Sequence, residues 1–343
     1  MGRYLPGHHF YRAMTNKTNE PDIIFILGIM PRSGTHFLWN LLALHPDCEK
    51  SAVPEDGLVS KSDMLARYVN LNYHVWQSEG DLPAIPARQL LFESLGEGLK
   101  LFLRRARAAA DQLTGEPAKQ ARYIVTKFPQ VTHIDKFFGL FPQQKLLILV
   151  RDGRALVESI NKSFRYDREE AIRDWALAAR RIAAFEKKWP EAKGKQYLVV
   201  QYETLYTNTE PELRRILDFL GLDAGRYDFA AAPDLPVVGS SVFKRGEGDV
   251  HWNPVSKTDD FNPLARTAGW TRRQHERFNW LAGKELVLSG YQPQAFAGSR
   301  TYWSLWNRLL DTGYSARVWF RRFRNLWWRI ERRTRNYFKR KGS

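Results

Sequence analysis

The sequence predicts an α/β fold in which helices cover both faces of a parallel sheet, giving three layers. Short apolar segments of strand length alternate with longer segments of helical periodicity, which is the pattern of consecutive β-α-β units. Residues 145–150 are apolar at every position after the first, as expected of a strand buried on both faces. The first apolar segment also leads through a short glycine-containing turn directly into a helical pattern.

This first segment predicts a strand, an anion-binding loop and a helix. Residues 23–27 are isoleucine, phenylalanine or leucine, and Gly28 ends the run. Four apolar residues at helical spacing follow, namely Phe37, Leu38, Leu41 and Leu42. Backbone N–H groups in the intervening turn, with the positive end of the helix dipole behind them, form a concave site for phosphate or sulfate.

The residues of the turn suit an anion other than a nucleoside triphosphate. Gly34 lets the backbone approach the ligand, Thr35 adds a hydroxyl group, and Arg32 adds a permanent charge with forked donors. In the triphosphate loop G-x-x-x-x-G-K-[ST], the glycines are closer by one residue than Gly28 and Gly34, and a lysine follows. No lysine follows Gly34, so a kinase or an ATPase is disfavoured.

Further strands and helices are expected in alternation along the chain. The expected strands are 122–128, 145–150 and 197–201, and the expected helices are 88–113, one starting at 155, 169–188 and 210–220. Residues 51–57 should form a loop across the top of the sheet, and residues 81–86 a proline-containing linker. Because ligands bind beyond the carboxyl ends of parallel strands, we expect Arg32, Lys127, Arg151 and Tyr202 to converge.

Length and composition indicate one domain with additions at both ends. We divide the 343 residues into an N-terminal extension (1–21), a domain (22–298) and a basic tail (299–343). The single cysteine, Cys48, excludes an intramolecular disulfide. Residues 1–22 contain no apolar signal sequence, so we expect a cytoplasmic protein.

Most of the net charge of +16 is carried by the tail. Residues 314–343 contain eleven lysines and arginines against Glu331, so this segment has a charge of +10 and the rest of the chain +6. The tail is expected to form two amphipathic helices separated by Gly313. Tryptophan and phenylalanine beside a cationic face are typical of helices that lie in anionic membranes, so peripheral attachment to the inner membrane face is one hypothesis. Packing on the domain or on a second subunit is the alternative, and nucleic-acid binding is disfavoured.

Two motifs resemble the donor-binding loops of sulfotransferases, which use 3′-phosphoadenosine-5′-phosphosulfate (PAPS). Residues 31–35 resemble the 5′-phosphosulfate loop, and residues 44–47 are similar to the stretch that follows it in the tyrosylprotein and bacterial branches. Residues 151–159 resemble the 3′-phosphate motif, in which Arg151 and Ser159 would bind the phosphate. The resemblance implies PAPS as co-substrate and a fold of the P-loop nucleotide-kinase-like type.

Three more matches extend the resemblance across most of residues 22–290. In 126–129, Lys127 would reach the sulfate of the donor, and in 202–205, Tyr202 would touch the adenine. Residues 243–249 are similar to a loop that closes over the 3′-phosphate. The resemblance therefore implies these donor-binding residues: Arg32, Ser33, Gly34, Thr35, His36, Arg151, Ser159, Tyr202, Lys244, Arg245 and Gly246.

The resemblance also implies sulfuryl transfer to an acceptor hydroxyl without a metal. Arg32 and Lys127 would offset negative charge on the oxygen that links sulfur to the leaving nucleotide. Glu55 is the first candidate for the base that activates the hydroxyl, Asp56 the second and His36 the third. For His36, donation to the 5′ anion and capping of the turn stay equally open.

Two alternative functions stay open at this stage. A small-molecule kinase with a divergent P-loop would bind a similar anion, although the loop lysine is missing. A non-catalytic basic adaptor for membrane or nucleic acid would keep the fold without turnover, although the loop residues are present. The acceptor is not predicted beyond a hydroxyl, with a lipid or a glycan preferred, and the oligomeric state is open.

Overall fold

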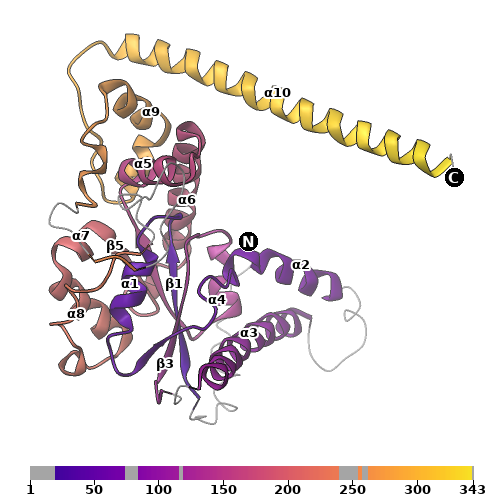
Figure 1. Ribbon diagram of the computed structural model, residues 1–343. Coiled ribbons are helices and arrows are strands. Elements are labelled where there is room, and N and C mark those ends of the chain that lie inside the picture. Colours follow the sequence, from indigo (N-terminus) through magenta and orange to yellow (C-terminus); the bar gives the residue numbers. More distant parts are fainter. Residues whose placement is uncertain (1–19, 74–83, 116–118, 239–253, 257–261, 342–343) are drawn as a thin grey trace.

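The centre of the molecule is a parallel sheet of five strands in the order β2-β3-β1-β4-β5 (Figure 1). The computed structural model describes residues 20–73, 84–115, 119–238, 254–256 and 262–341. The strands are β1 (Asp22–Gly28), β2 (Cys48–Lys50), β3 (Tyr123–Phe128), β4 (Lys145–Val150) and β5 (Tyr197–Gln201). The predicted α/β fold with a parallel sheet is confirmed, and four of the five strands lie where the sequence predicts them.

The remaining strand, β2, is missing from the prediction. It contains only three residues and pairs in parallel with β3, with Cys48 opposite Tyr123. Cys48 is fully buried, whereas Glu49 and Lys50 are partly exposed. A segment this short and polar has no strand pattern of its own, so its conformation depends on the neighbouring strand.

Helices cover both faces of the sheet, as predicted. Successive side chains of β1 point to opposite faces, so Ile24 and Ile26 join one core while Ile23, Phe25 and Leu27 join the other. The first core includes α1 (Thr35–Leu42), α7 (Tyr202–Thr207) and α8 (Thr209–Leu220). The second includes α3 (Ala84–Thr114), α4 (Phe137–Leu140), α5 (Gly153–Phe164), α6 (Arg168–Lys188) and α9 (Arg272–Leu288).

The second face also carries α2 (Ser62–Tyr73), which packs against α3. The helix α3 begins at Ala84, so the prediction of a linker over 81–86 is wrong for residues 84–86, and residues 81–83 lie outside the described residues. Pro86 lies in the first turn of α3, where its missing N–H breaks no helical hydrogen bond. Short 3-10 turns lie at Val59–Lys61, Ile134–Lys136, Pro190–Ala192, Ala224–Arg226 and Ala265–Thr267.

Close packing fixes the start of α5 at the end of β4. Asp152 caps the helix, because its Oδ1 accepts a hydrogen bond of 2.9 Å from the backbone N–H of Arg154. At Gly153, a Cβ would lie 2.5 Å from the ring of Trp175 and 2.7 Å from that of Phe278. The start of α5 therefore packs closely on α6 and α9, and the indole of Trp175 also donates to the backbone carbonyl of Arg151 (3.3 Å).

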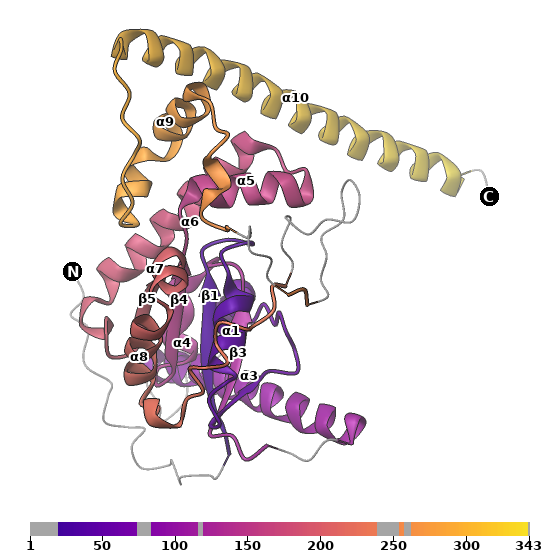
Figure 2. The ribbon, with the colours of Figure 1, turned by 60° about the vertical axis from the view of Figure 1, so that its left-hand side comes forward.

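The tail forms a single helix, α10 (Arg300–Lys341), so the prediction of two helices separated by Gly313 is wrong. Glycine weakens a helix by about 1 kcal/mol relative to alanine but does not break it. Asp311 and Tyr314, on either side of Gly313, both contact the domain. Figures 1 and 2 show α10 starting beside α9 and extending away from the rest of the molecule. Among the described residues, no helix combines the length and the apolar character needed to span a bilayer.

Candidate functional site

The predicted site residues meet at the carboxyl edge of the sheet. The loop with Arg32 follows β1, Arg151 follows β4, Tyr202 follows β5, and Lys127 is the penultimate residue of β3. Parallel pairing places Lys127 opposite Ile26 of β1, close to the start of the loop. The four residues therefore converge, as the topology predicts.

The loop between β1 and α1 turns sharply and is closed by Tyr202. Arg32 and Gly34 have positive φ values of 75° and 98°. A side chain is excluded at Gly34 because a Cβ there would also lie 2.4 Å from the ring of Tyr202. Ser33 is fully buried, and its Oγ has no hydrogen-bond partner within the described part of the chain. A buried hydroxyl group of this kind is suited to bind a ligand in the loop.

Two arginines gather behind the loop. Arg151 is buried and donates from Nη1 to the carbonyl of Arg32 (2.9 Å) and from Nη2 to the carbonyl of Pro263 (2.8 Å). The Nε of Arg32 lies 3.4 Å from the Oγ of Ser159, which is also buried. The guanidinium of Arg151 lies over the ring of Tyr202, with 4.2 Å between Cζ and the ring centroid. These contacts bring four of the predicted donor-binding residues, Arg32, Arg151, Ser159 and Tyr202, into one cluster.

Arg266, in the turn Ala265–Thr267, adds a third guanidinium group. Burial, together with the charges of Arg266 and Arg151, lowers the pKa of Arg32 to about 10. Burial and then the charge of Arg151 also lower the pKa of Arg266. Among the described residues, neither Arg32 nor Arg151 forms an ion pair with a carboxylate. A buried group of arginines that repel one another is the expected environment of a bound anion.

Arg266 lies outside every motif that the sequence offers, so the motifs do not point to it. Tertiary contacts bring its segment to the site: Arg151 binds the carbonyl of Pro263, and Trp270 donates from Nε1 to Glu158 of α5 (2.8 Å). The presence of a tryptophan shortly after Arg266 is the only sequence signal near it. Lys244, Arg245 and Gly246, which the resemblance assigns to the site, lie outside the described residues.

Lys127 is 1% exposed and forms an ion pair at the rim of the site. Its Nζ lies 3.1 Å from the Oε1 of Glu55, whose side chain is 46% exposed. Burial lowers the pKa of Lys127, and the charge of Glu55 opposes this shift. The lysine also lies beside the ring of Trp39, 5.5 Å from the ring centroid. Lys127 is therefore held in place, while Glu55 stays accessible to a substrate.

The neighbouring carboxylate, Asp56, is engaged in holding its own loop. One oxygen accepts a hydrogen bond from the backbone N–H of Leu58 (2.8 Å), and the other accepts one from the hydroxyl of Thr126. Burial raises the pKa of Asp56, although these two hydrogen bonds oppose the shift. The geometry therefore favours Glu55 over Asp56 as the carboxylate that faces an acceptor.

The two histidines near the loop have different environments. Burial and then the charge of Lys127 lower the pKa of His36 to about 4, so its imidazole is neutral at pH 7. His45 lies within hydrogen-bond distance of backbone groups of Asp47 (3.1 Å) and Asp223 (3.0 Å). His45 thus satisfies backbone groups of the chain. Within the described residues, no three side chains of histidine, cysteine, aspartate or glutamate group together as a metal site.

An aromatic cavity of about 340 Å³ lies on the α1 side of the sheet, next to Tyr202. Its walls include Phe37 of α1, Tyr206 of α7, Leu213 of α8 and Phe229. The ring of Tyr202 stacks on that of Tyr206 with 6.1 Å between centroids. A planar aromatic ligand has flat partners here.

Comparison with known proteins assigns the chain to a family. Residues 21–226 match the sequence profile of the Sulfotransferase family. A protein-tyrosine sulfotransferase of Drosophila melanogaster is 29% identical over 59% of this chain and 38% of its own length. Nodulation protein NoeE of Sinorhizobium fredii is 24% identical over 91% of this chain and 74% of its own length.

Solved structures of sulfotransferases also resemble the chain. A sulfotransferase domain from the curacin biosynthetic pathway is 17% identical, covers 81% of this chain and 100% of that domain, and has a TM-score of 0.45. The chain spans 38% of the length of the Drosophila protein-tyrosine sulfotransferase, so the similarity concerns only part of that relative. Since the family profile covers more than half of the chain, this protein belongs to the sulfotransferase family.

Proposed function

We propose that this protein transfers the sulfuryl group of PAPS to an acceptor hydroxyl. One observation carries the proposal: two arginines without a carboxylate partner among the described residues, Arg32 and Arg151, lie with Lys127 at one edge of the sheet. Family membership supports sulfuryl transfer as the reaction. The loop glycine spacing and the missing loop lysine argue against phosphoryl transfer from ATP.

The donor would bind through the two ends of its nucleotide. Residues 31–36 would hold the 5′-phosphosulfate, and the unpartnered Oγ of Ser33 fits a donor oxygen. Arg151, Ser159 and Arg266 would hold the 3′-phosphate, for which the unpartnered Nε of Arg151 is available. Lys244, Arg245 and Gly246 would close over this phosphate. Tyr202 and the aromatic cavity beside it would receive the adenine.

Catalysis would rest on positioning and charge. The oxygen of the acceptor hydroxyl forms a bond to sulfur, the bond from sulfur to the leaving nucleotide oxygen breaks, and the hydroxyl proton moves to Glu55. Lys127 and Arg32 would stabilise the negative charge that develops on the leaving oxygen. Because burial lowers the pKa of Lys127, this lysine is the group able to give that oxygen a proton, whereas Arg32 stays charged.

The acceptor is proposed at the level of chemical class. A relative named protein-tyrosine sulfotransferase suggests a phenolic hydroxyl, whereas the exposed position of Glu55 also admits a glycan or a lipid head group. We favour a lipid or glycan hydroxyl, because the basic helix α10 is suited to an anionic surface.

Thermal denaturation with nucleotides tests the donor. We expect 3′-phosphoadenosine-5′-phosphate to raise the melting temperature much more than ADP or ATP, because only it has a 3′-phosphate for Arg151. Transfer from sulfur-labelled PAPS to tyrosine peptides, glycans and lipid extracts would then identify the acceptor. Equal shifts with ATP, or phosphate transfer from labelled ATP, would contradict the proposal in favour of a kinase.

A further inference from the structure

The helix α10 has a long apolar stripe that is exposed to solvent. Six large side chains on it are between 52% and 66% exposed, namely Leu305, Leu309, Trp319, Phe320, Phe323 and Trp327. At 100° per residue, they project within an arc of about 100° on one side of the helix. The stripe is about 33 Å long at 1.5 Å per residue.

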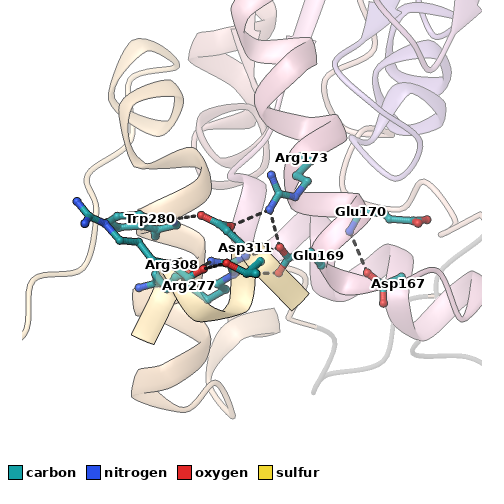
Figure 3. Close-up of polar contacts among 10 residues, drawn as sticks. Asp167, Glu169, Glu170, Arg173, Arg277, Trp280, Arg308 and Asp311 are labelled. Carbon is teal, nitrogen blue, oxygen red and sulfur yellow. Dashed lines mark hydrogen bonds and ion pairs between the residues drawn. The ribbon is translucent and has the colours of Figure 1, made fainter. Parts of the chain in front are cut away.

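The opposite face of α10 is attached to the domain. Asn307 is buried and accepts hydrogen bonds from Arg277 at Oδ1 (3.2 Å) and at its backbone carbonyl (3.1 Å). Asp311 accepts from Arg277 (2.7 Å), from Arg173 (3.0 Å) and from the indole of Trp280 (2.8 Å), as Figure 3 shows. Because these contacts hold the opposite face of α10 against the domain, the side chains of the stripe point away from the domain.

Two further contacts extend this attachment along the helix. The guanidinium of Arg173 lies over the ring of Tyr314, at 4.2 Å from its centroid, and Arg321 forms an ion pair with Glu170. With Asn307 and Asp311, these positions follow the helical repeat of one face. The apolar stripe therefore does not pack on the domain over residues 305–327. This excludes, for these side chains, the alternative that the aromatic tail packs on the domain.

Charge distinguishes between the partners that the stripe could contact. Residues 314–343 carry a charge of +10, and Arg308, Arg317 and Arg324 are exposed close to the stripe. A second copy of the chain would bring an equal positive charge against it, which is unfavourable. A single-stranded nucleic acid would neutralise the arginines and stack on the tryptophans, but it would leave the aliphatic side chains of Leu305 and Leu309 exposed to water. An anionic bilayer surface offers both negative charge and an apolar boundary.

We propose that α10 binds the surface of an anionic lipid bilayer, lying parallel to it with the apolar stripe at the boundary of head groups and acyl chains. The contacts of Arg277 and Arg173 with Asp311 then hold the domain beside the membrane. This proposal concerns a binding surface separate from the donor site, so it stands or falls independently of the reaction.

Vesicle sedimentation with the full-length protein tests the proposal. The protein should bind vesicles of phosphatidylcholine and phosphatidylglycerol, and it should bind pure phosphatidylcholine at least ~10-fold more weakly. The triple variant Trp319→Ser, Phe323→Ser, Trp327→Ser should lose ~100-fold or more in partition coefficient, because three aromatic side chains no longer enter the interface. Arg317→Glu with Arg324→Glu should weaken binding at least ~10-fold, as should high salt.

A matched control changes equally exposed apolar residues elsewhere. Met64→Ser, Leu71→Ser and Leu113→Ser replace side chains that are 65%, 65% and 88% exposed on α2 and α3, and should leave vesicle binding unchanged. Circular dichroism spectra and melting temperatures should be nearly equal in all variants, which would show that they are folded.

Three results would overturn the proposal. The first is that the wild-type protein ignores anionic vesicles at low salt. The second is that light scattering finds a dimer that becomes a monomer in the triple variant, which would assign the stripe to a second copy. The third is that the protein binds polyuridylate but not vesicles.

Discussion

Glu55 and Asp56 are adjacent carboxylates whose contacts differ. Glu55 is exposed and pairs with Lys127, whereas both oxygens of Asp56 are occupied by Leu58 and Thr126. A base must reach the acceptor proton, so access decides between the two. The resemblance ranks Glu55 first, and the contacts of Asp56 support the same order as a prediction.

Replacing Glu55 with glutamine should therefore lower kcat by ~10²-fold or more, because general-base catalysis contributes on that scale. Binding of 3′-phosphoadenosine-5′-phosphate, measured by calorimetry, should stay nearly normal. Asp56→Asn is the matched control, and it should lower the melting temperature rather than kcat. If Asp56→Asn were inactive and Glu55→Gln active, the base would be Asp56.

Arg266 is the residue whose role the tertiary contacts suggest most directly. We predict that Arg266→Ala weakens binding of 3′-phosphoadenosine-5′-phosphate by ~10- to 100-fold, since a charge-assisted hydrogen bond is worth about 1.5–3 kcal/mol. Adenosine 5′-phosphosulfate lacks the 3′-phosphate and should bind the variant and the wild type equally. Arg180→Ala, which removes an exposed arginine paired with Glu285, should change neither affinity. Equal losses for both ligands would place Arg266 outside the 3′-phosphate site.

At the scale of single elements, two glycines show how packing decides the effect of the same substitution. Gly313 is in α10, and a Cβ there would meet no atom within 4 Å. A Cβ at Gly153, at the start of α5, would lie 2.5 Å from Trp175. The sequence does not show this difference in packing. It shows only that Gly153 precedes a helical pattern and that Gly313 interrupts one.

Alanine at these two positions should have opposite effects on the free energy of unfolding. Gly313→Ala should raise helix content and stabilise α10 by about 0.5–1 kcal/mol, because alanine is the better helix former. Gly153→Ala should destabilise the domain by about 1–3 kcal/mol, because the added methyl overlaps the ring of Trp175. Circular dichroism and urea unfolding measure both changes. A stabilised Gly153→Ala variant would show that the contact with Trp175 relaxes freely.

At the scale of the whole molecule, Asp311 joins α10 to the domain. Burial alone would raise the pKa of Asp311, but hydrogen bonds from Trp280 and Arg277 and the charge of Arg277 lower it below its ordinary 3.8. A carboxylate with a depressed pKa stabilises the folded state above its unfolded pKa, and this stabilisation is lost as the pH falls through the folded value. The attachment of α10 should therefore weaken below about pH 4.

Asp311→Asn should destabilise the protein at pH 7, because Arg277 loses a charged partner. We expect a loss of only about 1–2 kcal/mol, because the side chain of Asp311 is partly exposed and solvent weakens the ion pair. The difference from wild type should begin to shrink as the pH falls below about 4 towards pH 3, because the wild-type carboxylate takes up a proton in this direction. Urea unfolding at both pH values measures this. Glu191→Gln, at an exposed carboxylate without an ion pair among the described residues, should have no effect at either pH. A difference that stayed constant with pH would show that the charge of Asp311 is not what matters.

The sequence by itself determined the α/β class, four of the five strands and the convergence of Arg32, Lys127, Arg151 and Tyr202. These features depend on patterns within short stretches of chain and on one topological rule, that parallel strands end at the same edge. The motif residues therefore needed no coordinates to be found.

Only the tertiary structure decided β2, the position of Arg266 beside the other arginines, the different contacts of Glu55 and Asp56, and the continuity of α10. Each depends on groups far apart in the sequence: β3 beside Cys48, Arg151 beside Pro263, Thr126 beside Asp56, and Arg277 beside Asp311. A local sequence pattern sets the preference of a segment for helix or strand. Where this preference is weak, the free energy of contacts that form only in the folded chain decides the conformation.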